Sequence, residues 1–270
     1  MQDSRIAAHG LVLLGCGKMG SAMLAGWLAR GVPPSRVWVQ DPAPSDWVRS
    51  TGVHINVALP KAPAVVLIAV KPQMMGDALP AISELAKGST VFVSVAAGTP
   101  LAAFEEAFGA QTPIVRAMPN TPAAVGQGIT AICANDAGQG ALDEAELLLS
   151  AVGAVVRLES EAQMDAVTGV SGSGPAYVFH MIETLAAGGV AQGLPHALAM
   201  QLAKATVAGA GALAMQSDDD PAQLRVNVTS PNGTTQAALE VLMDPKTGFP
   251  TLMLRAVAAA SDRSRELANG

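Results

Sequence analysis

The stretch that decides the fold is LVLLGCGKMG, residues 11–20, in which a short apolar run ends in three glycines spaced G-x-G-x-x-G. These are Gly15, Gly17 and Gly20. The spacing alone is weak evidence, because a chain with 27 glycines produces it by chance. Its meaning depends on the residues on either side.

The flanks of the glycines are typical of a dinucleotide-binding loop. A predicted strand over residues 11–14 precedes them, a predicted helix over residues 21–30 follows, and Asp41 ends the next predicted strand. A carboxylate about 20 residues beyond such a loop can bind a ribose hydroxyl. The glycines allow a tight turn and close approach of a pyrophosphate, and the helix N-terminus offers free N–H groups to its phosphates. We therefore predict a dinucleotide site rather than a plain turn.

Short apolar strands alternate with helical stretches up to about residue 158. This alternation predicts a doubly wound α/β sheet of Rossmann type. Unbroken runs such as VVLIAV favour parallel strands buried on both faces. The predicted strands cover residues 11–14, 37–40, 65–70, 90–94, 114–118, 129–134 and 155–158, and the predicted helices include 21–30 and 74–86.

Beyond about residue 159 the β-branched runs give way to long Ala, Leu and Met segments at helical spacing. We expect helices over residues 175–192, 196–216, 234–243 and 249–268. Their apolar character extends around much of each helix, as in helices buried in a core or a subunit interface. We predict a Rossmann dinucleotide-binding domain over residues 1–160 and an all-α dimerisation and substrate-binding domain over residues 161–270. A compact monomeric bundle is the alternative.

Composition excludes several classes of function. The longest apolar stretch, residues 62–70, is about half of the ~20 residues that a membrane-spanning helix needs. The N-terminus has neither a signal-like apolar core before Leu11 nor an Arg-rich transit pattern, so we expect a cytoplasmic protein. A net charge of −6 without runs of like charge argues against nucleic-acid or membrane partners.

Metal and hydrolase chemistry have no support in the sequence. The two cysteines and four histidines lack ligand spacing, so we expect no metal site and treat the cysteines as structural thiols. No G-x-S-x-G elbow is present. The chemistry is therefore left largely to the cofactor.

Other turns are candidates for the site. VKPQ (residues 70–73) and SVAAG (residues 94–98) follow strands, and ligands of open α/β sheets bind at that edge. Lys71 is either a substrate or proton-donor group or a solvated turn residue, and both interpretations stay open. The rigid turn RAMPNTP (residues 116–122) suits either cofactor enclosure or plain chain reversal.

In the second half, residues 165–179 and 227–239 are Ser/Thr/Gly-rich loops that run into helices. At the second of these, backbone N–H groups and the hydroxyls of Thr234 and Thr235 can receive a carboxylate, with an ordinary helix cap as the alternative.

Asp41 also bears on the choice of cofactor. Its charge would repel a 2′-phosphate, which favours NADH. Pro42 and Pro44 make the local backbone hard to place, so NADPH or NADH remains open.

Taken in order, GCGKMG, AVKPQ, SVAAG, RAMPNTP, DAVTGVSGSGPAYVF and SPNGTT closely resemble the pyrroline-5-carboxylate reductases of proline biosynthesis, from Leu11 to about Leu267. The resemblance implies an NAD(P)H-dependent oxidoreductase that reduces the C=N bond of 1-pyrroline-5-carboxylate to give L-proline. It also implies an interlocked homodimer or higher homo-oligomer, with residues of both subunits in each site. One departure is Asn232, where the family usually has glycine; Asn tolerates left-handed backbone, so the loop can keep its shape.

The resemblance further assigns site residues. Thr235 would lie near the ring nitrogen as the catalytic hydroxyl. The substrate residues would be Glu161, Ser171, Gly172, Ser173, Gly174, Thr234 and Thr235. The cofactor residues would be Gly15, Cys16, Gly17, Lys18, Met19, Gly20, Asp41, Asn56, Ala69, Val70, Lys71, Pro72, Ala96, Ala97, Gly98 and Asn227.

Two rival functions stay open. A related dehydrogenase acting on a β-hydroxy acid or another imine would typically use a lysine or acidic residue in the first helix of the second domain, but no lysine follows Gly174 until Lys204. A noncatalytic nucleotide-sensing or pyridoxal-phosphate-handling protein would instead bind NADH without turning over any imine.

Overall fold

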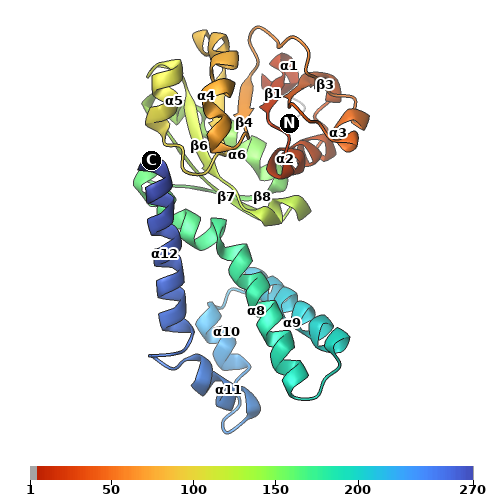
Figure 1. Cartoon of the computed structure of the whole chain (residues 1–270), viewed down its shortest axis with the longest axis vertical. Coiled ribbons are helices and arrows are strands. Elements are labelled where there is room, and N and C mark those ends of the chain that lie inside the picture. Colours follow the sequence, from red (N-terminus) through yellow and green to blue (C-terminus); the bar gives the residue numbers. More distant parts are fainter. Residues whose placement is uncertain (1–4, 270) are drawn as a thin grey trace. The chain divides into compact units, whose positions relative to one another are not determined.

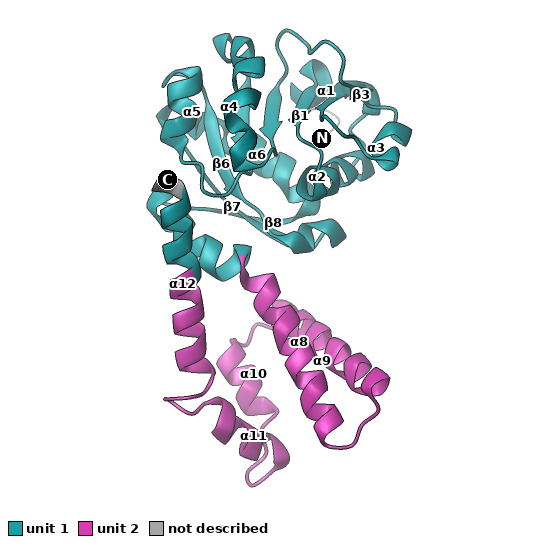
Figure 2. Ribbon diagram, in the orientation of Figure 1, with its two compact units in different colours: residues 1–172, 260–270 teal, residues 173–259 magenta. Residues whose placement is uncertain are grey.

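The computed structural model describes residues 5–269 and divides into two compact units. Residues 1–172 and 260–270 form unit 1, and residues 173–259 form unit 2 (Figure 2). The chain leaves unit 1 after Gly172 and returns to it within helix α12 (Phe249–Asn269). The domain boundary predicted at residue 160 stays a prediction, because a compact unit and an independently folding domain are different things.

Unit 1 is built on one eight-stranded sheet with the order β3-β2-β1-β4-β5-β6-β7-β8 (Figure 1). The pairs from β3 to β6 are parallel, β7 runs antiparallel to β6, and β8 runs parallel to β7. The strand order reverses between β1 and β4, where ligands of such sheets bind. The strands are β1 Leu11–Leu14, β2 Val37–Gln40, β3 His54–Ile55, β4 Val65–Ile68, β5 Val91–Ser94, β6 Ile114–Met118, β7 Gly128–Ala134 and β8 Gly153–Arg157.

Both faces of this sheet are covered, which confirms the predicted doubly wound fold. Leu13 packs in one buried cluster with Trp27, whereas Val12 packs in a second cluster with Phe104. Since successive side chains of a strand point to opposite faces, the two clusters lie on the two sides of the sheet. The α-helices of unit 1 are α1 Arg5–His9, α2 Lys18–Ala29, α3 Asp46–Ser50, α4 Met75–Ala78, α5 Leu101–Phe108, α6 Leu142–Leu149, α7 Met164–Val167 and the end of α12.

Tighter turns connect these elements. The 3₁₀ helices are η1 Pro34–Arg36, η2 Pro72–Met74, η3 Pro80–Lys87, η4 Thr121–Val125, η5 Asp136–Ala141, η6 Ser150–Val152 and η7 Glu161–Gln163, and η8 Thr168–Gly172 is a π-helical turn.

The structure corrects two local expectations and adds one strand. The helix predicted over residues 74–86 is wrong, because Pro80 lacks an N–H and divides it into short pieces. Strand β3 was not predicted, since two residues are too few to show a period. The loop predicted from residue 165 is wrong as well: α7 and the π-helical turn η8 make that segment helical before α8 begins.

Unit 2 consists of helices with very few buried side chains. They are α8 Gly174–Ala191, α9 His196–Gln216, α10 Pro221–Asn227, α11 Thr234–Leu242 and the first part of α12; α10 was not predicted. Helices α8 and α9 approach closely, so that a Cβ added to Gly189 would lie 3.3 Å from Ala199 Cβ. Large apolar side chains stay exposed, among them Met215 at 84% and Leu254 at 75%.

Helix α9 is long and apolar enough to cross a membrane by length and composition alone, and 11% of the tested window is buried. One such helix is weak evidence for a membrane span. An apolar helix that packs against another subunit has the same composition.

Candidate functional site

The loop after β1 is tightly packed at Gly15 and Gly20 and open at Gly17. Gly15 has φ +87°, and a Cβ there would lie 2.9 Å from the main chain of Ala69. A Cβ at Gly20 would collide with the carbonyl oxygen of Gly15. At Gly17 an added Cβ would have no neighbour within 4 Å. The open side at Gly17 is therefore where a phosphate group can approach the backbone.

Asp41 connects this loop to the end of β2. Its Oδ2 accepts a hydrogen bond from the Cys16 N–H at 2.6 Å, and its Oδ1 accepts one from the Ala43 N–H at 2.8 Å. Asn56, in the left-handed region at φ +52°, accepts from the Asp41 N–H at 3.0 Å and donates to the Asp41 carbonyl at 2.8 Å. Asp41 and Asn56 are thus joined by two hydrogen bonds beside the glycine loop.

A cavity of about 600 Å³ opens beside these residues, a size typical of small-molecule and cofactor sites. It lies at the carboxyl ends of β1, β2 and β4, and the turn 69–72 reaches it through Val70. The side chain of Lys71 is exposed, and Lys71 is not among the residues that line the cavity. The lining residues are Leu14, Gln40, Asp41, Pro42, Asn56, Val57, Ala58, Leu59, Val70, Met74, Asp77, Ala78, Ala81 and Ile82.

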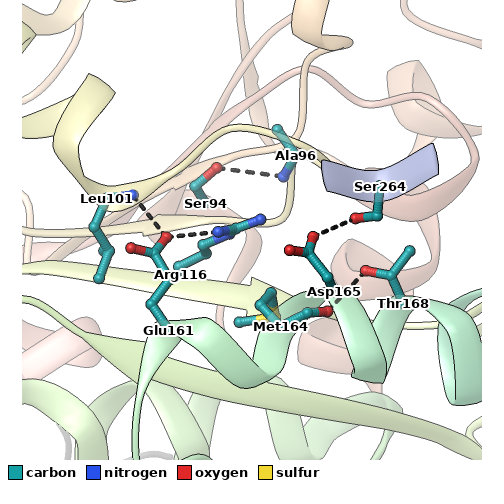
Figure 3. A network of polar contacts seen from close by, with 9 residues as sticks. All are labelled: Ser94, Ala96, Leu101, Arg116, Glu161, Met164, Asp165, Thr168 and Ser264. Atoms are coloured by element: carbon teal, nitrogen blue, oxygen red, sulfur yellow. Dashed lines mark hydrogen bonds and ion pairs between the residues drawn. The ribbon is translucent and has the colours of Figure 1, made fainter. Parts of the chain in front are cut away.

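A polar network supports the turn that follows β5 (Figure 3). The Ala96 N–H donates to Ser94 Oγ at 3.3 Å, and the Leu101 N–H, at the start of α5, donates to Glu161 Oε1 at 2.8 Å. The same Glu161 oxygen binds Arg116 Nη1 at 2.5 Å. These hydrogen bonds therefore hold the start of the turn 96–98, which was predicted to contact the cofactor, and the first residue of the helix that follows it.

Glu161 and its neighbour Asp165 are both engaged within unit 1. Glu161 was predicted to bind substrate, and its carboxylate bonds Arg116 and Leu101, so the substrate role stays a prediction. Asp165 Oδ1 accepts from Ser264 Oγ at 2.6 Å, which ties the end of α12 to this unit (Figure 3). Sequence reasoning missed Arg116, although a lone charge inside an apolar strand was a usable signal.

Burial keeps both thiols unreactive. It raises the pKa of Cys16, an effect that the hydrogen bond with Ser21 partly offsets. Burial also raises the pKa of Cys133 to about 11, with a further contribution from the Glu161 carboxylate. Both cysteines are therefore protonated near neutral pH and are poor nucleophiles.

The predicted substrate residues fall in both units. Ser171 and Gly172 lie in the π-helical turn of unit 1, where Ser171 Oγ donates to the Val167 carbonyl at 3.1 Å. Ser173 and Gly174 begin α8 in unit 2. Asn227, predicted to reach the cofactor, ends α10, and its Nδ2 donates to Asp219 Oδ2 at 3.2 Å.

Thr234 and Thr235 occupy the first turn of α11 in unit 2. Asn232 has φ +58°, so the predicted left-handed conformation is confirmed, and its N–H donates to Gln236 Oε1 at 2.8 Å. Gly233 is the N-cap residue, with extended backbone. Within residues 5–269, neither threonine hydroxyl has a hydrogen-bond partner. This nine-residue helix thus presents free N–H groups and two hydroxyls at one end.

Comparisons with known proteins place these features in context. A family model described as pyrroline-5-carboxylate reductase dimerisation matches residues 161–267, and one described as NADP oxidoreductase coenzyme F420-dependent matches residues 10–98. A pyrroline-5-carboxylate reductase of Pseudomonas aeruginosa is 40% identical over 265 residues, which cover 96% of each chain.

Two solved structures have the same fold. A pyrroline-5-carboxylate reductase from Coxiella burnetii matches with a TM-score of 0.90 and 32% identity, covering 96% of this chain and 98% of that one. A pyrroline carboxylate reductase of Plasmodium falciparum with NADP bound matches with a TM-score of 0.82 and 28% identity, with the same coverage.

Proposed function

Since the chain belongs to the pyrroline-5-carboxylate reductase family, we propose that it is an NAD(P)H-dependent oxidoreductase that reduces 1-pyrroline-5-carboxylate to L-proline, the last step of proline biosynthesis. The strongest support is the 40% identity to the Pseudomonas aeruginosa relative over 96% of both chains. The aligned region includes every helix, strand and turn to which a role is given below.

Unit 1 fits a dinucleotide. The open side of the loop at Gly17 suits a pyrophosphate, and the first N–H groups of α2 would face its charge. Asp41 would bind the adenosine ribose, with Asn56 holding its backbone in place. Val70 and the turn 96–98 would contact the nicotinamide half. When bound, the reduced nicotinamide supplies a hydride.

The N-terminus of α11 is the proposed carboxylate site. Its free N–H groups and the Thr234 hydroxyl can bind a carboxylate without an arginine or lysine, because the helix dipole favours negative charge there. The Thr235 hydroxyl would bond the ring nitrogen. A hydride adds to C5, the π electrons of the C=N bond move to nitrogen, and the proton of the iminium form stays on that nitrogen in the product.

The protein would act mainly by alignment. A protonated imine is already electrophilic, so strong acid catalysis is unnecessary, and holding the reacting carbons at about 3–3.5 Å accounts for much of the rate. Fixing the carboxylate at α11 would limit the substrate ring to one orientation.

The chain forms a homo-oligomer, as its dimerisation region implies, and we propose a homodimer built through unit 2. The buried apolar side chains in the described part of that unit are Ala186, Ala199 and Ala203. Exposed apolar residues line α8, α9 and α12, including Leu185, Leu202 and Leu252 at 48% each. Burying them against a second copy would supply the core that the helices lack. The cytoplasmic location, and the absence of nucleic-acid and membrane partners, stay predictions.

The test is a turnover assay with product identification. The purified chain is incubated with 1-pyrroline-5-carboxylate and either NADH or NADPH, and the amino-acid product is resolved by chiral chromatography. L-proline in step with cofactor oxidation supports the proposal. Turnover of a β-hydroxy acid or another imine alone would favour the rival dehydrogenase, and tight cofactor binding without turnover would favour the sensor.

A further inference from the structure

We propose that this chain selects NADH over NADPH, and that Asp41 and Asp77, with the two prolines after β2, are the residues that make the choice. The inference rests on the proposed function and names the cofactor which that function leaves open. It is not implied by the Plasmodium falciparum neighbour, whose structure has NADP bound.

The charge of the cavity beside Asp41 is the first observation. The charged side chains among its lining residues are Asp41 and Asp77, both acidic, and the lining contains no lysine or arginine. NADPH differs from NADH by a 2′-phosphate, and placing like charges together at a binding site is costly. The ribose hydroxyls of NADH would instead donate hydrogen bonds to a carboxylate.

The three residues directly after Asp41 offer no free N–H donor to a phosphate. A phosphate is usually held by arginine or by a group of free N–H donors. Pro42 and Pro44 have no N–H, and the Ala43 N–H already bonds Asp41 Oδ1 at 2.8 Å. The Ser45 Oγ caps α3 by accepting from the Val48 N–H at 3.3 Å. The first cation after Asp41 is Arg49, which is exposed on α3.

Asp41 cannot move aside cheaply to admit a phosphate. Rotating its side chain away would break the bonds to the Cys16 and Ala43 N–H groups. Its backbone is held by the two hydrogen bonds with Asn56. The acidic group is therefore part of the loop, and the preference for NADH follows from the fold of this segment.

The experiment measures binding of each cofactor without imine. Titrations of NADH and NADPH, followed by the fluorescence of the reduced nicotinamide, are expected to give a Kd for NADH lower by about tenfold or more. In Asp41→Asn and in Asp77→Asn the ratio of the Kd for NADPH to the Kd for NADH should fall, because NADPH binds these variants more tightly than it binds wild type. Glu106→Gln removes the same charge from the exposed face of α5, away from the cavity lining, and should leave the ratio unchanged.

Each outcome decides the matter. Wild-type protein that binds NADPH as tightly as NADH overturns the inference, as does a ratio unaltered in both aspartate variants. Asp77→Asn leaves the bond between Asp41 and Cys16 intact, so it serves if Asp41→Asn does not fold. A failure of the proposed function would give a different result from a failure of this inference. In that case 1-pyrroline-5-carboxylate would oxidise neither NADH nor NADPH, whatever the ratio of their Kd values.

Discussion

The ion pair between Arg116 and Glu161 allows a quantitative test of how unit 1 is stabilised. Glu161→Ala removes the acceptor of both Arg116 Nη1 and the Leu101 N–H. The Arg116 side chain is only 7% exposed, whereas that of Glu161 is 30% exposed. The variant therefore leaves a buried guanidinium without this carboxylate and the start of α5 without this acceptor.

The expected cost follows from this burial. Removing one partner of a buried pair costs about 3–5 kcal/mol, because an uncompensated charge remains. Water reaches the exposed part of Glu161 and can solvate the gap, so we expect a lower value, about 2–3 kcal/mol. Glu161→Gln keeps an oxygen that can accept from Leu101 and should cost about 1 kcal/mol.

Urea unfolding followed by tryptophan fluorescence measures this cost. The three tryptophans, Trp27, Trp38 and Trp47, all lie in unit 1, so the signal reports that unit. Glu84→Ala, which breaks an ion pair whose side chains are 71% and 80% exposed, is the control and should change stability by less than about 0.5 kcal/mol. If Glu161→Ala matched that control, the reasoning would be refuted. Unchanged stability with a raised KM for the imine would instead support the substrate role predicted for Glu161.

Three further predictions test the site and the turn before α12. Gly17→Val should fold normally, because nothing lies within 4 Å of the new Cβ, but should weaken NADH binding by about 100-fold or more, measured by fluorescence titration; an unchanged Kd would contradict the pyrophosphate assignment. Thr235→Val should lower kcat/KM for 1-pyrroline-5-carboxylate by about tenfold, the loss of one hydrogen bond, with the Kd for NADH unchanged; full activity would remove Thr235 from the site. The pKa of Asp244 is lowered by hydrogen bonds from the Thr247 hydroxyl, the Thr247 N–H and the Lys246 N–H. The Asp244 carboxylate therefore contributes fully to stability above its usual pKa of 3.8, and this contribution is lost as the pH falls through the lower pKa of the folded state. Asp244→Asn should therefore melt below wild type at pH 7, and the difference in Tm should shrink as the pH falls below the usual pKa of 3.8 and through the lower pKa of the folded state; a constant difference in Tm would contradict this linkage.

Local geometry explains which parts of the site could be predicted from the sequence. The glycine loop needs open space at Gly17 and a left-handed backbone at Gly15, and glycine is the residue that meets both needs, so the G-x-G-x-x-G spacing could be recognised in the sequence. Asn232 was predictable for the same reason, because its φ of +58° is a property of one residue that Asn tolerates.

Contacts between distant residues could not be predicted in this way. Arg116 on β6 and Glu161 in η7 are 45 positions apart, and they meet only in the folded chain. In the turn Thr168–Gly172, Ser and Thr favour a loop by composition. In the structure the hydroxyls of Thr168 and Ser171 donate to the carbonyls of Met164 and Val167, four residues earlier, so both side chains find acceptors within a helical segment.

The most direct test of the proposed reaction follows the hydride itself. The purified chain is given 1-pyrroline-5-carboxylate and a reduced cofactor with two deuterium atoms at C4 of the nicotinamide, and the product is analysed by mass spectrometry and NMR. We expect L-proline with one deuterium, at C5, and one cofactor oxidised per proline. Unlabelled proline, deuterium at another carbon, or no proline at all would contradict it.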